Sequence, residues 1–217
     1  MLKVNNLAGF GARMNTSGPP VTSLAFQASA TGTTSVTGPA SIIAGDLLVL
    51  ANNAVTGGGA PSATVPSGFT SIGTVADGAS RSVISYKIAD GSEASASIAG
   101  MSGASFNAHC LYVFRGDEAV NTVTPGSVAG QITTGNPTAQ VVTSGSGSAP
   151  LVVIGVYGSD VAVSPRSFSP AKSGEINVST FYYLAYLIYN SSPANVTVDM
   201  DDESNSNVLQ SCYLEVL

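Results

Sequence analysis

The feature of this sequence that most restricts its fold is a series of segments that occurs twice in the same order. Each copy of the series predicts strands with an apolar face, and such a face is stable only when another layer covers it. The matching segments lie 99 to 104 residues apart: Leu47–Asn52 with Leu151–Val156, Phe69 with Phe168, Tyr86 and Ile88 with Tyr186 and Ile188, and Cys110 with Cys212. We therefore expect two similar halves that stack face to face and bury both apolar faces.

Alternating polarity identifies the strands. Ile84, Tyr86 and Ile88 alternate with polar side chains within Ser80–Asp90, which is the pattern of a half-buried antiparallel strand. Leu47–Ala51 is apolar at every position and predicts a strand that is buried on both faces. The sequence therefore predicts an all-β fold, an antiparallel, jelly-roll-like β-sandwich.

The N-terminal segment differs from the rest of the chain. Leu7 and Phe10 lie in a short apolar stretch that glycines interrupt, and Thr16–Pro20 ends in two prolines, which favour an extended linker. Two interpretations remain open: a disordered terminus, or an arm whose Leu7 and Phe10 insert into a partner. The predicted organisation is an arm or linker over residues 1–20 and a sandwich domain over 21–217, which consists of half one (21–116), a connector (117–147) and half two (148–217).

Composition limits the classes of function. Charged residues make up 9% of the chain, against roughly 25% in an average soluble protein; so few charges are typical of a protein that is docked in an assembly. The net charge is −6 and the seven Lys and Arg residues are scattered, which argues against nucleic-acid binding. No apolar stretch approaches the roughly 18 residues of a membrane span. Since the first residues also lack the pattern of a signal peptide, we expect neither membrane insertion nor secretion by the general route.

No arrangement of residues in the sequence specifies catalysis or a cofactor. The single histidine, His109, is adjacent to Cys110, and neighbouring residues of a strand point to opposite faces. We therefore expect His109 to be a structural or surface residue rather than a metal ligand or a general base. No Gly-x-Ser-x-Gly elbow and no phosphate-binding loop occurs. We predict no catalytic residue, no cofactor and no metal site.

Two further features leave an alternative open. Cys110 and Cys212 lie within apolar strand patterns, which predicts buried thiols, with a disulfide as the alternative. The acidic run Asp199–Glu203 has a composition that suits calcium, but a turn of solvated charges is the commoner explanation of such a run.

The segment Thr180–Asn190 departs from the pattern of its counterpart in the first half. Its inward-facing positions are apolar, as in the first half, but the positions on the opposite face are apolar or aromatic as well. This strand is therefore predicted to be covered on both faces. The cover is either the N-terminal arm or the connector folding back, or else a partner or a second copy, since aromatic residues are enriched in interface cores. The candidate partner-binding residues are accordingly Leu7, Phe10, Phe181, Tyr183, Leu187 and Tyr189.

Three motifs stand out along the first half. They are Gly-Asp-Leu-Leu-Val-Leu at 45–50, Pro-Ser-Gly-Phe-Thr-Ser-Ile-Gly at 66–73 and Ser-Tyr-Lys-Ile-Ala-Asp-Gly-Ser-Glu at 85–93. Together they resemble a family of β-sandwich modules in tailed bacteriophages and prophages, and the resemblance covers roughly residues 22–217. The start Leu7-Ala8-Gly9-Phe10-Gly11 is also similar to that of small phage structural proteins.

The resemblance implies a non-enzymatic virion component, such as a head decoration, head fibre or tail accessory protein. It implies capsid or tail proteins as partners, a homo-oligomer, and assembly in the host cytoplasm. The alternative is a host-receptor or carbohydrate-binding module on the same virion. Lectin-like modules stack sugars on exposed aromatic side chains, whereas this chain has no Trp and its Tyr residues are concentrated in one strand. A polysaccharide-degrading enzyme is a third reading, for which no acid/base carboxylate pair can be identified.

Overall fold

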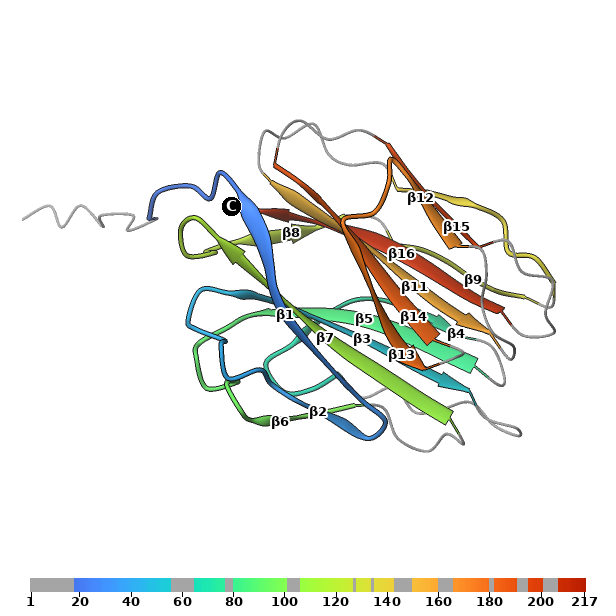
Figure 1. Cartoon of the computed structure of the whole chain (residues 1–217), viewed down its shortest axis with the longest axis horizontal. Coiled ribbons are helices and arrows are strands. Elements are labelled where there is room, and N and C mark those ends of the chain that lie inside the picture. The colour runs from blue at the N-terminus through green and yellow to red at the C-terminus, as the bar shows by residue number, and fades with distance from the viewer. Residues whose placement is uncertain are drawn as a thin grey trace, which may run out of the picture.

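The structure, a computed structural model, is all-β, and its described segments contain strands and no helix (Figure 1). Accordingly, none of these segments forms a helix that could cross a membrane. The strands make four layers, in which two large sheets pack face to face and a small sheet covers the outer face of each. The predicted antiparallel β-sandwich is confirmed. The described residues are 18–55, 65–76, 80–100, 106–126, 128–133, 135–142, 150–159, 166–179, 182–190, 195–200 and 207–217.

The first large sheet contains strands from the first half of the chain, and every neighbouring pair is antiparallel. Its order is β1-β7-β3-β5-β4, with β3 in the middle. Every residue of Leu47–Ala51 in β3 is buried, as the sequence predicts. The strands are β1 (Leu24–Gly32), β3 (Leu47–Val55), β4 (Thr70–Ala76), β5 (Ser80–Ile88) and β7 (Phe106–Gly116).

The second large sheet has the order β13-β14-β11-β16-β8, and β9 also pairs with β16. Its central strand β11 is buried at every position. The connector supplies β8 and β9, so it completes this sheet instead of only linking the halves. The strands are β8 (Val123–Pro125), β9 (Ala129–Thr133), β11 (Leu151–Ser159), β13 (Gly174–Ser179), β14 (Tyr182–Tyr189) and β16 (Asn207–Val216).

The two small sheets form the outer layers. A pair of short strands, β2 and β6, lies over the outer face of the first sheet, and the order β10-β15-β12 covers the second. β10 lies within the connector. The strands are β2 (Ser35–Thr37), β6 (Ser97–Ala99), β10 (Gln140–Val142), β12 (Arg166–Ser169) and β15 (Val196–Met200).

The two large sheets repeat one arrangement of three strands. In the first sheet β3 lies between β7 and β5, and in the second β11 lies between β16 and β14. This shared order confirms two similar halves. The first sheet forms within the first half, and the second forms from the connector and the second half, so the chain passes between them after β7. The similarity to a jelly roll therefore lies in the layers, whereas the connectivity is that of two sheets formed in succession.

The structure corrects the alignment of the two central strands. Val49 pairs with Tyr86, and Ile154 pairs with the equivalent Tyr186. The central strands therefore match at an offset of 105 residues by this pairing, and at 103 by the pairing of Ala51 with Cys110 and of Ile154 with Cys212. The predicted offset of 104 is wrong, because it aligns an inward-facing residue with an outward-facing one. Both strands are apolar on both faces, so their sequences contain no alternation that would fix the register.

The outer face of β5 is also buried, which corrects the prediction of a half-buried strand. Ser85 is fully buried and Val83 is 1% exposed, although both lie on the face opposite Ile84. Val83 packs with Ala54 of β3 and with Val65, which lies in the segment before β4, and the Ser85 hydroxyl donates a hydrogen bond to Leu50 O (3.5 Å). Only the first and last outward-facing side chains of the strand, on Arg81 and Lys87, are partly exposed.

An aromatic cluster fills the space between the large sheets near β1 and β14. The Phe26 ring stacks on the Tyr186 ring with centroids 5.0 Å apart, and Tyr112 and Phe114 each meet Tyr186 edge-on at 5.4 Å. The hydroxyl of Tyr112 donates a hydrogen bond to the carbonyl oxygen of Leu184 (2.5 Å). A side chain of the first sheet is thereby bonded to the backbone of the second.

The two edges of the sandwich are held in different ways. At the β4/β9 edge, a Cβ on Gly73 would lie 2.7 Å from the Val128 side chain, so the chain approaches too closely there for any residue but glycine. A Cβ on Gly130 would likewise lie within 1.9 Å of a side-chain atom of β4. At the β1/β13 edge, the side-chain amide of Asn190 binds both the N–H and the carbonyl of Leu24 (2.7 and 3.2 Å).

Candidate functional site

The three sequence motifs meet at one corner of the first sheet, which we call the motif corner (residues 45–50, 66–73 and 85–93). Gly45 N donates to Ala89 O (2.9 Å) and Ala89 N donates to Asp46 O (2.8 Å), which joins the first motif to the third. Gly45 has a φ of +89° and abuts Ala119, so a side chain at this position would be strained as well as crowded. The corner is therefore one hydrogen-bonded unit.

Asp46 anchors the first motif. Its carboxylate is 1% exposed and accepts hydrogen bonds from Arg115 Nε (2.7 Å) and Arg115 Nη2 (2.9 Å), an arrangement in which one guanidinium binds both carboxylate oxygens. Arg115 Nη2 also donates to Ser41 O (2.7 Å), and Ile43 N donates to Asp46 Oδ2 (3.0 Å). The hydrogen bond to Asp46 raises the pKa of Arg115. The loop before β3 is thus fixed to the end of β7.

The pairing of β4 with β5 joins the second motif to the third, and Lys87 closes the turn within the third motif. Its ammonium pairs with the buried carboxylate of Glu93 and with Asp90 Oδ2 (3.0 Å). The hydrogen bond to Glu93 is the main cause that raises the pKa of Lys87. Hydrogen bonds from Ser92 lower the pKa of Asp90 to about 2. Lys87 and Asp90 therefore carry full charges at neutral pH and hold the turn after β5 closed.

A pocket of about 320 Å³ opens beside this ion pair. Phe69, Pro66 and Ile98 supply apolar walls, while Lys87 and Glu93 supply charge. Glu93 and Ala96, which line the pocket in the β5–β6 turn, lie on either side of Ser95, whose φ is +58°. Chemically, the pocket offers hydrogen bonds and an apolar surface.

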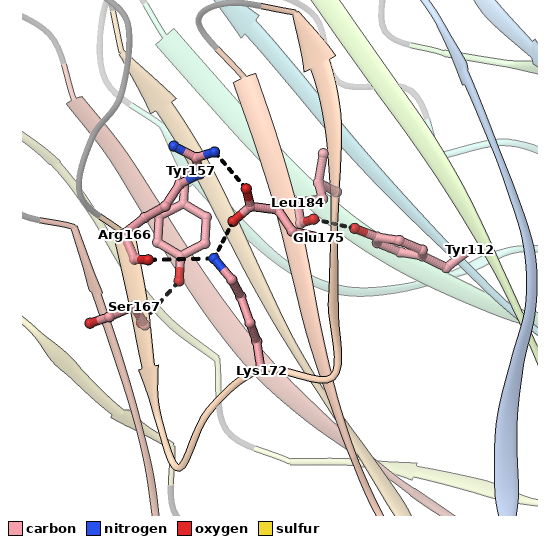
Figure 2. A network of polar contacts seen from close by, with 7 residues as sticks. All are labelled: Tyr112, Tyr157, Arg166, Ser167, Lys172, Glu175 and Leu184. Carbon is pink, nitrogen blue, oxygen red and sulfur yellow. Dashed lines mark hydrogen bonds and ion pairs between the residues drawn. The ribbon is translucent and has the colours of Figure 1, made fainter.

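A second polar network holds the outer sheet against the second large sheet (Figure 2). Arg166 Nη2 and Lys172 Nζ each lie 2.5 Å from a different oxygen of Glu175, and Tyr157 donates to Ser167 O (3.2 Å). The guanidinium of Arg166 also lies 3.3 Å from the centroid of the Tyr183 ring, a cation–π contact. These contacts clamp β12 and its following turn onto the edge strand β13.

The structure places three of the predicted partner-binding residues beneath this outer sheet. Tyr183 and Leu187 are 8% and 6% exposed, and Tyr189 packs against the same cluster. The second face of β14 is thus covered by β10, β15 and β12, of which β10 belongs to the connector. This intramolecular cover accounts for the apolar face that motivated the interface hypothesis. The other candidates, Leu7, Phe10 and Phe181, lie outside the described residues.

The histidine and the two cysteines that the sequence singled out are buried in the structure. His109 is fully buried on the face opposite Cys110, and its Nδ1 lies 2.8 Å from Asn52 Oδ1. Cys110 and Cys212 are both free thiols in the inner core, as predicted. Of the acidic run, Asp199 accepts a hydrogen bond from the N–H of Met200, and Asp201, Asp202 and Glu203 lie outside the described residues. Within the described segments no group of His, Cys, Asp or Glu side chains is arranged to hold a metal ion.

Both ends of the described chain emerge at one end of the sandwich (Figure 1). Gly18 lies beside Asn121, whose N–H donates to Leu217 O (3.0 Å). Leu217 and Ile43 are 46% and 52% exposed, which makes them large apolar side chains on the surface of this end. We call this surface the terminal end.

Sequence reasoning identified the motifs but missed the pairs of residues within them. The signal available was the Asp-Gly-Ser-Glu turn, which places Glu93 six residues after Lys87, within reach of an ion pair across a tight turn. For Arg115 and Asp46 no local signal exists, because 69 residues separate them. The comparisons with known proteins add no name to the site: no family model, no curated protein and no solved structure matches this chain.

Proposed function

We propose that this protein is a non-enzymatic structural component of a tailed-bacteriophage virion. The observation that carries the proposal is the motif corner. Three motifs that are dispersed over residues 45–93 form one unit, because backbone hydrogen bonds of Gly45 and Asp46 with Ala89 join the first motif to the third and the pairing of β4 with β5 joins the second to the third. The resemblance to virion β-sandwich modules is therefore a resemblance of a whole structural unit, which supports the proposal more strongly than three independent turns would.

The terminal end suggests how the protein attaches. Gly18 lies beside Asn121, which is hydrogen-bonded to Leu217, and the exposed Ile43 lies near Ala119 of the same loop. We propose that this end faces the capsid or tail and that Leu7 and Phe10 bind a capsid or tail protein. Incorporation then takes place during assembly in the host cytoplasm, and several copies decorate each particle.

The experiment that tests the function is a quantitative protein inventory of purified particles from the phage or induced prophage that encodes the chain. We expect the protein to copurify with infectious particles at a fixed number of copies per particle. Its absence from particles, together with its presence in the cleared lysate, would contradict the proposal. The receptor- or carbohydrate-binding alternative predicts a different pair of results. The protein would be incorporated normally in the unmodified phage, and a phage with the gene deleted would form particles that no longer adsorb to the host.

Attachment has a separate test. A chain that lacks residues 1–17 keeps every described residue and should retain its circular dichroism spectrum and thermal midpoint. We expect this chain to be missing from particles, because the arm supplies the contact. The matched control is the full-length chain with Leu7 and Phe10 exchanged for each other, which preserves apolar content. Incorporation of the shortened chain at the normal copy number would contradict the role of the arm.

A further inference from the structure

The space between the two large sheets is apolar along most of its length but polar at the end away from the chain termini. Asn53 on β3 and Ser82 on β5 are direct cross-strand partners. They share the inward-facing side with Ala51 and Ile84, which lie two residues away and belong to the inner core. Asn53 is 1% exposed and Ser82 is fully buried. The first sheet thus presents an amide and a hydroxyl to the second.

Gln210 approaches the same region from the second sheet. It is fully buried on β16, and it faces inward together with Cys212. Its Nε2 donates to Gly73 O (3.2 Å) on β4. The backbone of β4 at this point runs beside β5, where Gly73 pairs with Ile84 and Val75 pairs with Ser82. The Gln210 amide therefore lies over the part of the first sheet that carries Ser82.

These three side chains have hydrogen-bonding capacity that the described residues do not use. Both amide atoms of Asn53, the hydroxyl oxygen of Ser82 and Oε1 of Gln210 are buried without a hydrogen-bond partner among the described residues. Buried polar atoms in native proteins are almost always hydrogen-bonded, since an unsatisfied one loses its interactions with water and gains nothing in return. Such atoms on two facing sheets indicate a shared partner between them.

We propose that Asn53, Ser82 and Gln210 form a buried site for one or two ordered water molecules that link the two halves of the sandwich. The site contains an amide donor, two amide oxygens and a hydroxyl that both donates and accepts. Water matches this mixed set because each molecule donates two hydrogen bonds and accepts two. Ordered waters of this kind occupy polar sites and make two to four hydrogen bonds each. An ion is a poorer match, since all three side chains are neutral.

A crystal structure at a resolution that shows ordered water tests the site directly. We expect a water oxygen about 2.7–3.2 Å from polar atoms of at least two of the three side chains. Direct hydrogen bonds between Asn53 and Gln210 with no water between them would overturn the proposal. So would an empty, dry space between the same side chains.

A pair of serine variants tests the site in solution. Ser82 and Ser85 are both fully buried on β5 but face opposite sides of the sheet, so Ser85→Ala is the matched control for Ser82→Ala. We expect Ser82→Ala to lower the thermal midpoint by about 2–4 °C, because the remaining partners hold the water less well, and Ser85→Ala to lower it less. A Ser82→Ala midpoint that equals or exceeds that of the unmodified protein would overturn the proposal, because removal of an unsatisfied hydroxyl from a dry site relieves a cost.

Discussion

Asp46 and Glu93 are buried carboxylates in a chain with few charges, and each has a cationic partner, Arg115 for Asp46 and Lys87 for Glu93. An uncompensated charge in the interior is strongly unfavourable, so removal of one partner from such a pair costs more than removal of an exposed pair. At the scale of the residue, these pairs therefore fix loops to strands. Asp46 joins the loop before β3 to Arg115 at the end of β7, which no local contact could do.

The first prediction concerns this ion pair. Asp46→Asn keeps the size of the side chain but removes its charge, and it replaces one acceptor oxygen with a donor that faces Arg115. We expect the free energy of unfolding, measured by urea titration, to fall by about 1–3 kcal/mol. The control is Asp90→Asn, whose carboxylate is 61% exposed; its effect should be smaller. Equal effects of the two substitutions would show that burial of Asp46 is unimportant.

The second prediction concerns the two thiols. Burial raises the pKa of both Cys110 and Cys212 from 9.0 to about 12. The folded chain therefore retains these protons more strongly than the unfolded chain, and the resulting stability is complete below pH 9 and is lost as the pH rises toward 12. At pH 8 we expect no reaction with a thiol reagent in the folded state and two reactive thiols per chain in denaturant. Rapid labelling of the folded protein would contradict this prediction.

At the scale of the element, the sequence predicts those strands whose two faces differ in polarity. Ile84 and Tyr86 alternate with polar residues, and this pattern assigns the inward face of β5 correctly. The outer sheets were not predicted as layers, because β10, β12 and β15 are only three to five residues long and their pairing joins distant segments, as in Val142 with Val196. The sequence showed that β14 needs cover on both faces, but not which strands provide it.

Gly155 allows this cover to approach the central strand, which gives the third prediction. A Cβ at this position would lie 2.7 Å from the Phe168 ring and 3.0 Å from Val198. We expect Gly155→Ala to lower the free energy of unfolding by about 1–3 kcal/mol through overpacking, with a change in the near-ultraviolet signal of the aromatic residues. Gly18→Ala is the control, because its methyl group would make only an ordinary contact with Asn121. An unchanged free energy of unfolding in Gly155→Ala would contradict this prediction, because it would mean that the outer sheet moves to accommodate the methyl group without loss of stability.

At the scale of the whole molecule, stability depends on contacts between the two halves. The repeat in the sequence predicts that the halves stack, since each has an apolar face, but it contains no information on the polar links. Tyr112 and Gln210 each reach the backbone of the opposite sheet. The sequence does not predict either link. A Tyr in a strand pattern is interpreted as an apolar core residue, and the sequence does not show which group its hydroxyl binds.

The fourth prediction tests one such link. Tyr112→Phe removes the hydroxyl that donates to Leu184 O and leaves the ring in the aromatic cluster. We expect the free energy of unfolding to fall by about 1 kcal/mol in urea titration, without a change of fold. Tyr86→Phe is the matched control, because the Tyr86 hydroxyl lies 3.5 Å from Val123 O and contributes a weaker hydrogen bond. A larger loss from Tyr86→Phe would contradict the assigned role of Tyr112.

The glycines at the β4/β9 edge have a mechanical consequence. At this edge the backbone of Gly73 packs directly against the Val128 side chain, and that of Gly130 against the Val75 side chain. The β1/β13 edge is held instead by the Phe26–Tyr186 stack and the Asn190 amide. The two large sheets are therefore held more tightly along the β4/β9 edge than along the β1/β13 edge. We expect mild urea to open the sandwich from the β1/β13 edge, so that the Phe26 and Tyr186 rings lose their fixed environment, as followed by NMR, before Val75 and Val128 lose theirs.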